Sequence, residues 1–334
     1  MTYKVTIQPS GHEFSAAVGE TLLTAALNAG FALPYGCRNG ACGACKGRLL
    51  NGQVDYGTHQ ETALSEEDKR KGLALFCCAT PRSDLTIEAK EVGAVKDIPI
   101  RTLPCRVETM QRLADDVMLL RLKLPSNERL QFLPGQYIDF LLKDGSRRSF
   151  SLANTPEDDA LLELHVRHVP GGRFTDHVFE TMKLKDIMRI SGPYGSFFLR
   201  ESDTPAIFVA GGTGFAPIKS VLAHAFHHAV ERRFVLYWGA KRLPDLYQPD
   251  VPGEWQARHA NFSFIPVLSE PAAADAWPGR TGLVHQAVLA DFDDLSGHEV
   301  YACGAPPMID AARRDFTARG LPADAFFSDS FDFQ

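Results

Sequence analysis

The chain has 334 residues, of which 45% are hydrophobic and 23% charged, and its formal net charge is −6. This length and composition predict a globular protein of two or three domains, and the acidic balance argues against a nucleic-acid binder, which needs a basic surface. No apolar run reaches the roughly 18–20 residues of a membrane span, and residues 1–7 lack the apolar core of a signal peptide, so we expect a cytoplasmic protein with neither a nucleic-acid nor a membrane partner.

Residues 1–92 predict a small α+β domain with short strands and one helix. The apolar pattern places these elements at Lys4–Gln8, Glu13–Val18, Thr21–Ala29 (the helix), Gly47–Leu50 and Leu85–Ala89. Ser65 is followed by acidic residues, as at a capped helix start. Residues 93–103 lack helical periodicity and contain glycine and proline, which indicates a linker.

A cysteine-rich loop follows the predicted helix. Cys37, Cys42 and Cys45 have the spacing C-x4-C-x2-C, which is typical of plant-type [2Fe–2S] ligation. The fourth thiolate must come from a distant segment, and Cys77, after 31 intervening residues, and its neighbour Cys78 are both candidates. A structural zinc site is the alternative, but the loop has only one C-x2-C pair. A second alternative is that these cysteines are buried free thiols. The chain has seven cysteines and no secretion signal, which argues against a disulfide framework.

The remainder of the chain divides into two further domains. Residues 104–202 predict an antiparallel barrel with strands at Val117–Leu124, Tyr137–Leu142, Ser149–Leu152, Leu161–Val169 and Ile187–Ser191. Residues 203–334 alternate strands and helices, which predicts a doubly wound parallel sheet. The strands are expected at Ala206–Ala210, Phe234–Trp238, Phe262–Val267 and Glu299–Cys303, and the helices at Pro217–Val230, His285–Ala290 and Pro307–Arg319.

The barrel segment contains a candidate flavin site. Arg148, Phe150 and Ser151 are expected on one side of a strand, where they could clamp a pyrophosphate, stack on a ring and bond a ring nitrogen. Gly171 and Gly172 precede the expected helical stretch Asp176–Met182 and could form a phosphate-binding turn. The alternative is an ordinary barrel strand followed by an ordinary turn.

A second glycine-rich loop follows the buried strand of the last domain. Its residues Gly211–Pro217 open a helix, which is the context in which backbone amides bind a pyrophosphate. Cys303 ends a later strand, and taken alone it would be interpreted as a buried apolar thiol. Lys241 or Arg242 could meet the 2′-phosphate of NADPH.

The helix after the glycine loop carries several histidines. His224 and His228 are expected on one face, and no acidic partner accompanies them in the sequence. We therefore interpret them as part of a solvated helix face rather than a metal site.

Together these motifs resemble known families. PYGCRNGACGACKG and FCCATPRSDL resemble plant-type ferredoxins, whereas RRSFSLAN, HVPGGRFTDHVF, AGGTGFAPIKS and YACGAPPM resemble the ferredoxin–NADP reductase superfamily. The order of the blocks is similar to the reductase components of benzoate dioxygenase, phenol hydroxylase and soluble methane monooxygenase, and in particular to the group named CDP-6-deoxy-Δ-3,4-glucoseen reductase. The resemblance implies a multidomain α+β and α/β fold: a β-grasp ferredoxin, an antiparallel β-barrel FAD domain and a doubly wound parallel-sheet NAD(P)-binding domain.

The resemblance also implies roles for individual residues. The cluster ligands would be Cys37, Cys42, Cys45 and Cys77. FAD and the nicotinamide would be bound by Arg148, Phe150, Ser151, Leu152, His165, Val166, Gly171, Gly172, Thr175, Gly211, Gly212, Thr213, Gly214, Pro217, Cys303 and Gly304. Ser151 would bond flavin N5, Cys303 and Asp329 would position the nicotinamide, and Phe331 would shield the flavin.

The implied activity is stepwise electron transfer. NAD(P)H, with NADH favoured as in similar reductases, would reduce FAD, and single electrons would leave through the [2Fe–2S] cluster to a separate electron-accepting protein, a deoxysugar dehydrase or an oxygenase. The alternatives are a stand-alone flavin or ferric reductase and a ferredoxin-type carrier with a vestigial flavin domain. We expect a monomer or a weak oligomer.

Overall fold

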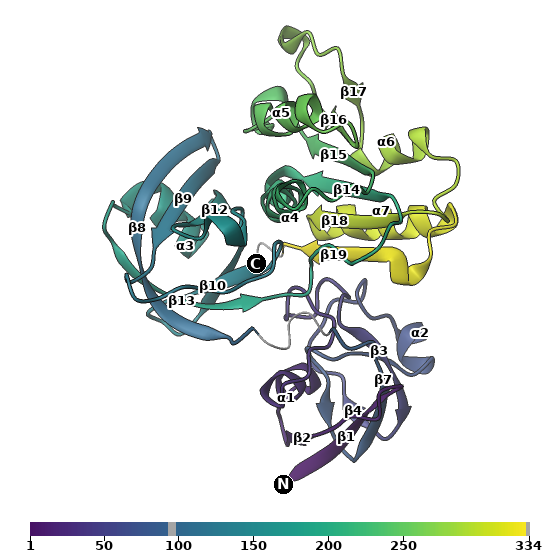
Figure 1. Cartoon of the computed structure of the whole chain (residues 1–334). Coiled ribbons are helices and arrows are strands. Elements are labelled where there is room, and N and C mark those ends of the chain that lie inside the picture. Colours follow the sequence, from purple (N-terminus) through teal and green to yellow (C-terminus); the bar gives the residue numbers. More distant parts are fainter. Residues whose placement is uncertain (93–97, 332–334) are drawn as a thin grey trace. The chain divides into compact units, whose positions relative to one another are not determined.

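The computed structural model describes residues 1–92 and 98–331, and the chain divides into two compact units (Figure 1). The first unit is Met1–Pro99 together with the described tail from Ser328, and the second is Ile100–Phe327, so this division falls within the last strand, β19 (Phe326–Ser330). Of the predicted linker 93–103, residues 93–97 lie outside the described residues. Its last part is not a linker, because a strand begins at Arg101.

The first unit is built on a five-stranded mixed sheet. Its strand order is β2-β1-β7-β3-β5, with β1 antiparallel to β2 and parallel to β7. The elements are β1 (Thr2–Gln8), β2 (Glu13–Ala17), α1 (Leu22–Asn28), β3 (Lys46–Asn51), α2 (Glu66–Arg70), β5 (Leu73–Leu75) and β7 (Leu85–Glu88), with a separate pair formed by β4 (Val54–Asp55) and β6 (Thr80–Pro81). This arrangement confirms the expected ferredoxin-type α+β fold.

Both helices of this unit start at capped residues. The Thr21 hydroxyl accepts from the Thr24 amide at 3.2 Å, and the side chains of Ser65 and Asp68 form a reciprocal capping box. Such caps satisfy amides that have no partner inside a helix. The helix α1 then buries an apolar face on the side opposite its polar residues.

The second unit begins with an antiparallel barrel. Its six strands run in the order β11-β10-β13-β8-β9-β12, and a bridge between Leu152 and Leu164 joins the two ends. The elements are β8 (Arg101–Ala114), β9 (Val117–Lys123), β10 (Tyr137–Leu141), β11 (Arg147–Ser151), η2 (Pro156–Asp158), β12 (Leu162–Arg167), α3 (Arg173–Asp176), η3 (His177–Thr181) and β13 (Ile187–Tyr194). Closure leaves the apolar side chains of alternate positions facing one core.

The unit continues into a six-stranded sheet in the order β17-β16-β15-β14-β18-β19. The strands are β14 (Ala206–Gly211), β15 (Phe234–Ala240), β16 (Phe262–Leu268), β17 (Arg280–Thr281), β18 (Glu299–Gly304) and β19 (Phe326–Ser330). The helices are η4 (Gly212–Gly214), α4 (Phe215–His227), η5 (Leu243–Asp245), α5 (Asp250–Arg258), η6 (Ala273–Asp275), α6 (Val284–Asp291), α7 (Pro306–Ala318) and η7 (Ala323–Ala325). The strand β14 is parallel to β15 on one side and to β18 on the other, so the strand order reverses there.

The structure adds elements that the sequence pattern did not predict. The helix α5 contains Pro252 and Gly253, two residues that disfavour helix interiors. Near the glycine pair, the expected helical stretch Asp176–Met182 is instead the short helix α3 followed by a π-helical turn. Within the described residues, no helix is long and apolar enough to cross a membrane.

Candidate cofactor sites

The cysteine loop joins α1 to β3 in the first unit. Its backbone has positive φ angles at Arg38, Gly40 and Gly43, of 61°, 79° and 71°, which lets the chain curl tightly. The Cys42 amide donates to the Cys37 sulfur at 3.3 Å, and the Cys37 amide donates to the Cys42 sulfur at 3.4 Å. Amides that point at sulfur stabilise thiolates and tune a cluster, so this loop fits iron ligation.

The fourth cysteine follows β5. Cys77 is buried, and the side chain of Cys45 and burial raise the pKa of its thiol against an opposing effect of Cys78. The sulfur of Cys78 lies 3.5 Å from that of Cys77, and a Cβ at Gly40 would lie 2.8 Å from it. The fold therefore brings the Cys77 side chain to that of Cys45, whereas the Cys78 sulfur lies beside Gly40 of the loop. The four-thiol donor set fits a [2Fe–2S] cluster.

The strand β11 carries an unsatisfied hydroxyl. Ser151 is buried, and its Oγ has no hydrogen-bond partner among the residues that the structure describes. Buried hydroxyls are nearly always hydrogen-bonded, so this atom fits a polar atom of a bound flavin. Consecutive strand residues point to opposite faces, so the expectation that Ser151 shares a side with Phe150 and Arg148 is wrong.

The other residues of this motif contribute differently. The ring of Phe150 packs against Phe140 and Phe174, with centroids 5.9 and 5.2 Å apart. The guanidinium of Arg148, on the same face, donates to the Arg147 carbonyl at 2.8 Å. The side chain of Leu152 lies in the barrel core. Phe150 is therefore held by packing and Arg148 by a local bond.

The strand β12 holds a buried polar network. Val166 packs into the barrel core, whereas the His165 ring lies within 3.0 Å of the Tyr247 hydroxyl and 3.3 Å of Glu163. Burial lowers the pKa of His165. The Lys219 ammonium of α4 lies 2.8 Å from Glu163. These contacts connect the barrel to the parallel-sheet domain, and they engage the His165 ring that the sequence assigned to cofactor binding.

The glycine pair after β12 forms a closed turn. Gly171 has a φ of 78°, and a Cβ on Gly172 would lie 2.6 Å from the Thr175 hydroxyl. That hydroxyl donates to the Val169 carbonyl at 2.9 Å and accepts from the Val169 amide at 3.1 Å. The side chain of Thr175 thus braces the turn from inside.

The sequence reasoning missed one cation near the glycine loop. A Cβ on Gly212 would lie 2.9 Å from both terminal guanidinium nitrogens of Arg167, which pairs with Asp116 at 3.3 Å. A fixed arginine beside glycine backbone suits a phosphate. Its position at the end of a strand, before the glycine pair, was the available signal.

The glycine loop lies where the strand order of the parallel sheet reverses. Ala210 of β14 is paired with Cys303 of β18, and a Cβ on Gly214 would lie 2.0 Å from the Cys303 carbonyl oxygen. A Cβ on Gly211 would lie 2.7 Å from the Met308 sulfur. Ligands of open parallel sheets bind at such a switch point. The close backbone approach explains the glycines and fits a dinucleotide.

The rest of the loop supports the same assignment. Thr213 is buried within η4, and Pro217 is buried in the first turn of α4, a helix of 13 residues whose N-terminal amides can bind phosphate. The Trp238 indole donates to the Gly212 carbonyl at 3.0 Å and fixes the loop. A Cβ on Gly304, which follows Cys303, would lie 2.8 Å from the Met308 methyl group.

The described tail residues of the first unit end in an acidic and an aromatic residue. A Cβ on Gly36 would lie 3.0 Å from the Asp329 carboxylate, so this carboxylate is next to the cysteine loop. Burial, and then the charge of Cys37, raise the pKa of Asp329 to about 7. Phe331 is partly buried. Residues 332–334 lie outside the described residues.

Comparisons with known proteins agree with these sites. Family models match a 2Fe-2S iron-sulfur cluster binding domain over residues 5–82, an oxidoreductase FAD-binding domain over 104–199 and an oxidoreductase NAD-binding domain over 208–314. The expected fold class and the three expected cofactors are thereby confirmed.

Individual relatives match over nearly the whole chain. The CDP-6-deoxy-L-threo-D-glycero-4-hexulose-3-dehydrase reductase of Yersinia pestis is 41% identical over 99% of each chain. The reductase component of a Pseudomonas phenol 2-monooxygenase is 40% identical over 93% of this chain and 89% of that protein. The solved structure of the reductase GcoB of Amycolatopsis has a TM-score of 0.81 and 33% identity, with 100% of both chains covered. The chain therefore belongs to the family of NAD(P)H-dependent oxidoreductases that combine a [2Fe–2S] ferredoxin domain, an FAD-binding barrel and an NAD-binding domain in one polypeptide.

Proposed function

We propose that this protein takes a hydride from NADH and delivers single electrons to a separate acceptor protein. The observation that carries the proposal is the set of four cysteines, three in the loop and Cys77 after β5, within one compact unit of a chain that also holds a glycine loop at a sheet switch point. A nicotinamide gives electrons in pairs, and FAD, when bound, supplies the conversion to the single electrons that a cluster accepts.

The residues of the chain would act by position rather than by strong acid or base chemistry. The first-turn amides of α4, together with Arg167 beside Gly212 of the glycine loop, would hold the phosphates of a dinucleotide. Ser151 would offer its buried hydroxyl to flavin N5. We keep Cys303 and Asp329 as residues that position the nicotinamide and Phe331 as a shield of the flavin.

The nicotinamide we assign is NADH. Lys241 follows β15 with a side chain that is 74% exposed and 4.0 Å from the Glu270 carboxylate. The nearby acidic group opposes a second negative charge from a 2′-phosphate. We expect kcat/KM for NADH to exceed that for NADPH at least tenfold, a ratio that corresponds to about 1.4 kcal/mol.

The acceptor we favour is a dehydrase that acts on a deoxysugar. The name of the Yersinia relative refers to such a dehydrase, and that relative spans 99% of both chains. An oxygenase is the second candidate, because the phenol 2-monooxygenase component is 40% identical. We further propose a monomer or weak oligomer in the cytoplasm, a compartment that suits seven cysteines without a disulfide.

Anaerobic visible spectra, recorded before and after addition of NADH and then NADPH, test the electron path. We expect flavin and iron–sulfur absorbance that both bleach with NADH. A protein that lacks either chromophore, or that ignores both nucleotides, would instead be a carrier with a vestigial flavin domain.

Turnover measurements then test the acceptor. We expect NADH oxidation to rise when a purified dehydrase of this class is added, and an oxygenase component serves as the competing acceptor. Turnover on soluble flavin or ferric complexes that neither protein stimulates would identify a stand-alone reductase.

A further inference from the structure

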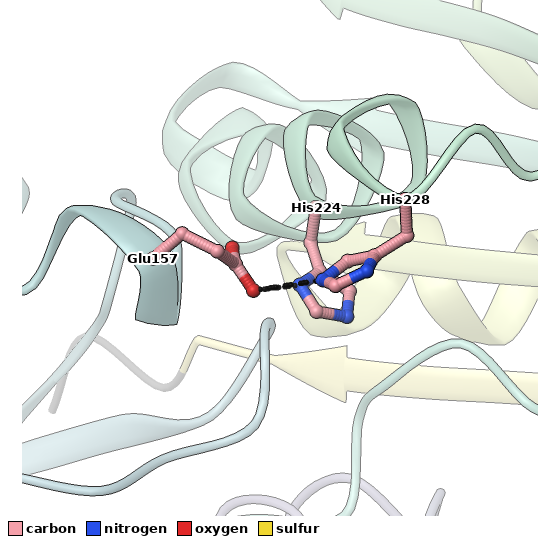
Figure 2. A group of neighbouring side chains, drawn as sticks. All are labelled: Glu157, His224 and His228. Carbon is pink, nitrogen blue, oxygen red and sulfur yellow. Dashed lines mark hydrogen bonds and ion pairs between the residues drawn. The ribbon is translucent and has the colours of Figure 1, made fainter.

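The histidines of α4 have an acidic partner that the sequence did not reveal. Glu157, on η2 of the barrel, contacts both His224 and His228 through one carboxylate oxygen, Oε1 (Figure 2). The distances are 2.8 Å to His224 Nδ1 and 3.0 Å to His228 Nε2. The expectation that these histidines have no acidic partner is therefore wrong.

The three side chains converge at one point. His224 is in the last turn of α4 and His228 caps its C-terminus, so four-residue spacing places both rings on one face, with centroids 4.4 Å apart. One donor atom from each of the three residues lies within 4.8 Å of the others. The three donor atoms therefore lie close enough together to share one ion.

We propose that Glu157, His224 and His228 form a binding site for a divalent transition-metal ion of the zinc class. Two imidazoles and one carboxylate are a donor set of known zinc sites with an open fourth position. Magnesium and calcium prefer oxygen ligands alone, so imidazole donors select zinc, nickel or copper.

The two distances between a histidine nitrogen and the Glu157 oxygen need little change to accept the ion. Bonds of 2.0–2.1 Å in a tetrahedral site separate neighbouring donors by about 3.3 Å. Each histidine nitrogen would therefore retreat from the Glu157 oxygen by about half an ångström or less. The side chains are 25%, 34% and 52% exposed for Glu157, His224 and His228, so an ion can reach them and they have room to adjust.

The ion would cross-link two parts of the second unit. Glu157 follows the barrel strand β11, whereas α4 begins at the glycine loop of the parallel-sheet domain. A ligand that binds only the folded state raises the midpoint of thermal unfolding. Metal binding should thus stabilise the packing of α4 against the barrel.

Calorimetric titration with Zn²⁺ tests the site. The protein should carry its flavin and cluster, so that the loop cysteines are occupied, and should have no polyhistidine tag. We expect one equivalent to bind, and we expect His224→Ala, His228→Ala and Glu157→Gln each to weaken it at least tenfold. The Glu157→Gln variant keeps the size of the side chain and therefore separates ligation from packing.

His227→Ala is the matched control. His227 lies in the same turn, next to His228 and edge-on to its ring, and is outside the triad. The affinity of this variant for Zn²⁺ should stay within twofold of the wild-type affinity. Zn²⁺ should raise the midpoint of thermal unfolding of the wild type and of His227→Ala, but not that of the three triad variants. Unchanged affinity in the three triad variants, an equal loss in His227→Ala, or the absence of binding would each show a solvated ion-pair cluster and overturn the proposal.

Discussion

At the scale of single residues, an unsatisfied atom is more informative than a motif. Ser149 and Ser151 stand two positions apart on β11, yet the Ser149 hydroxyl donates to Asp139 at 2.7 Å whereas the Ser151 hydroxyl has no partner among the described residues. The sequence identified the segment through its resemblance to a flavin motif. It could not show which hydroxyl was already engaged, because that depends on the neighbouring strand β10.

The two serines give a matched pair of substitutions. Ser151→Ala should slow NADH-dependent flavin reduction about fivefold, because it removes one hydrogen bond worth about 1 kcal/mol, and should leave stability unchanged. Ser149→Ala should instead lower the free energy of unfolding by about 1–2 kcal/mol and leave the rate unchanged. Stopped-flow absorbance and denaturant unfolding measure the two effects, and equal rate losses would refute the assignment.

The adjacent cysteines provide a second residue-scale test. Cys77→Ser should abolish the iron–sulfur absorbance of the purified protein, because its sulfur is the one that the fold brings to Cys45. Cys78→Ser should retain that absorbance, since the Cys78 thiol contacts Cys77 and lies beside Gly40. Iron and sulfide analysis gives the count of clusters, and the reverse pattern would make Cys78 the fourth ligand.

At the scale of elements, periodicity predicted the regular strands and helices well. The buried strand β14 was predicted within one residue at its C-terminal end, because a continuous apolar run leaves little ambiguity. The strand β8 was missed: over its 14 residues only Leu103, Cys105 and Val107 are buried, so most of its length lacks an apolar pattern. Its position depends on pairing with β9 and β13, which local sequence does not encode.

The contact between β12 and α4 predicts a pH dependence. Burial disfavours the charge of Glu163, but His165 and Lys219 outweigh burial and hold the pKa of Glu163 well below its usual range. A carboxyl with a lowered folded-state pKa stabilises the protein above its unfolded pKa of about 4.3, and this contribution is lost as the pH falls further.

Unfolding measured between about pH 3 and pH 7 checks this expectation. The stability difference between the wild type and Glu163→Gln should be largest near neutral pH and should shrink below about pH 4. A difference that is constant across this range would show that the ion pair does not contribute. Glu254→Gln, which changes an exposed pair on α5, serves as the control.

At the scale of the whole chain, the sequence predicted the cofactor-binding domains better than the side-chain contacts. The cysteine spacing and the glycine loops are local motifs, and each lies within residues that a cofactor-domain family model matches. Three long-range contacts were not predicted: Glu157 with His224, 67 residues apart, Glu163 with Lys219, 56 residues apart, and Arg167 beside Gly212, about 45 residues apart. Long-range pairing of polar groups leaves no periodic signal in a single sequence.

The contact between Gly214 and the Cys303 carbonyl has a genetic consequence. A carbonyl oxygen is present whatever residue occupies position 303, so no second mutation can make room for Gly214→Ala. A suppressor screen that starts from this variant should yield only same-site revertants. Gly211→Ala contacts the flexible end of Met308, and suppressors with a smaller residue at position 308 should arise. The two glycines, three residues apart, should therefore differ in epistasis. No second mutation should compensate a substitution at Gly214, whereas a substitution at Gly211 should be compensated by a change at Met308, almost a hundred residues later in the chain.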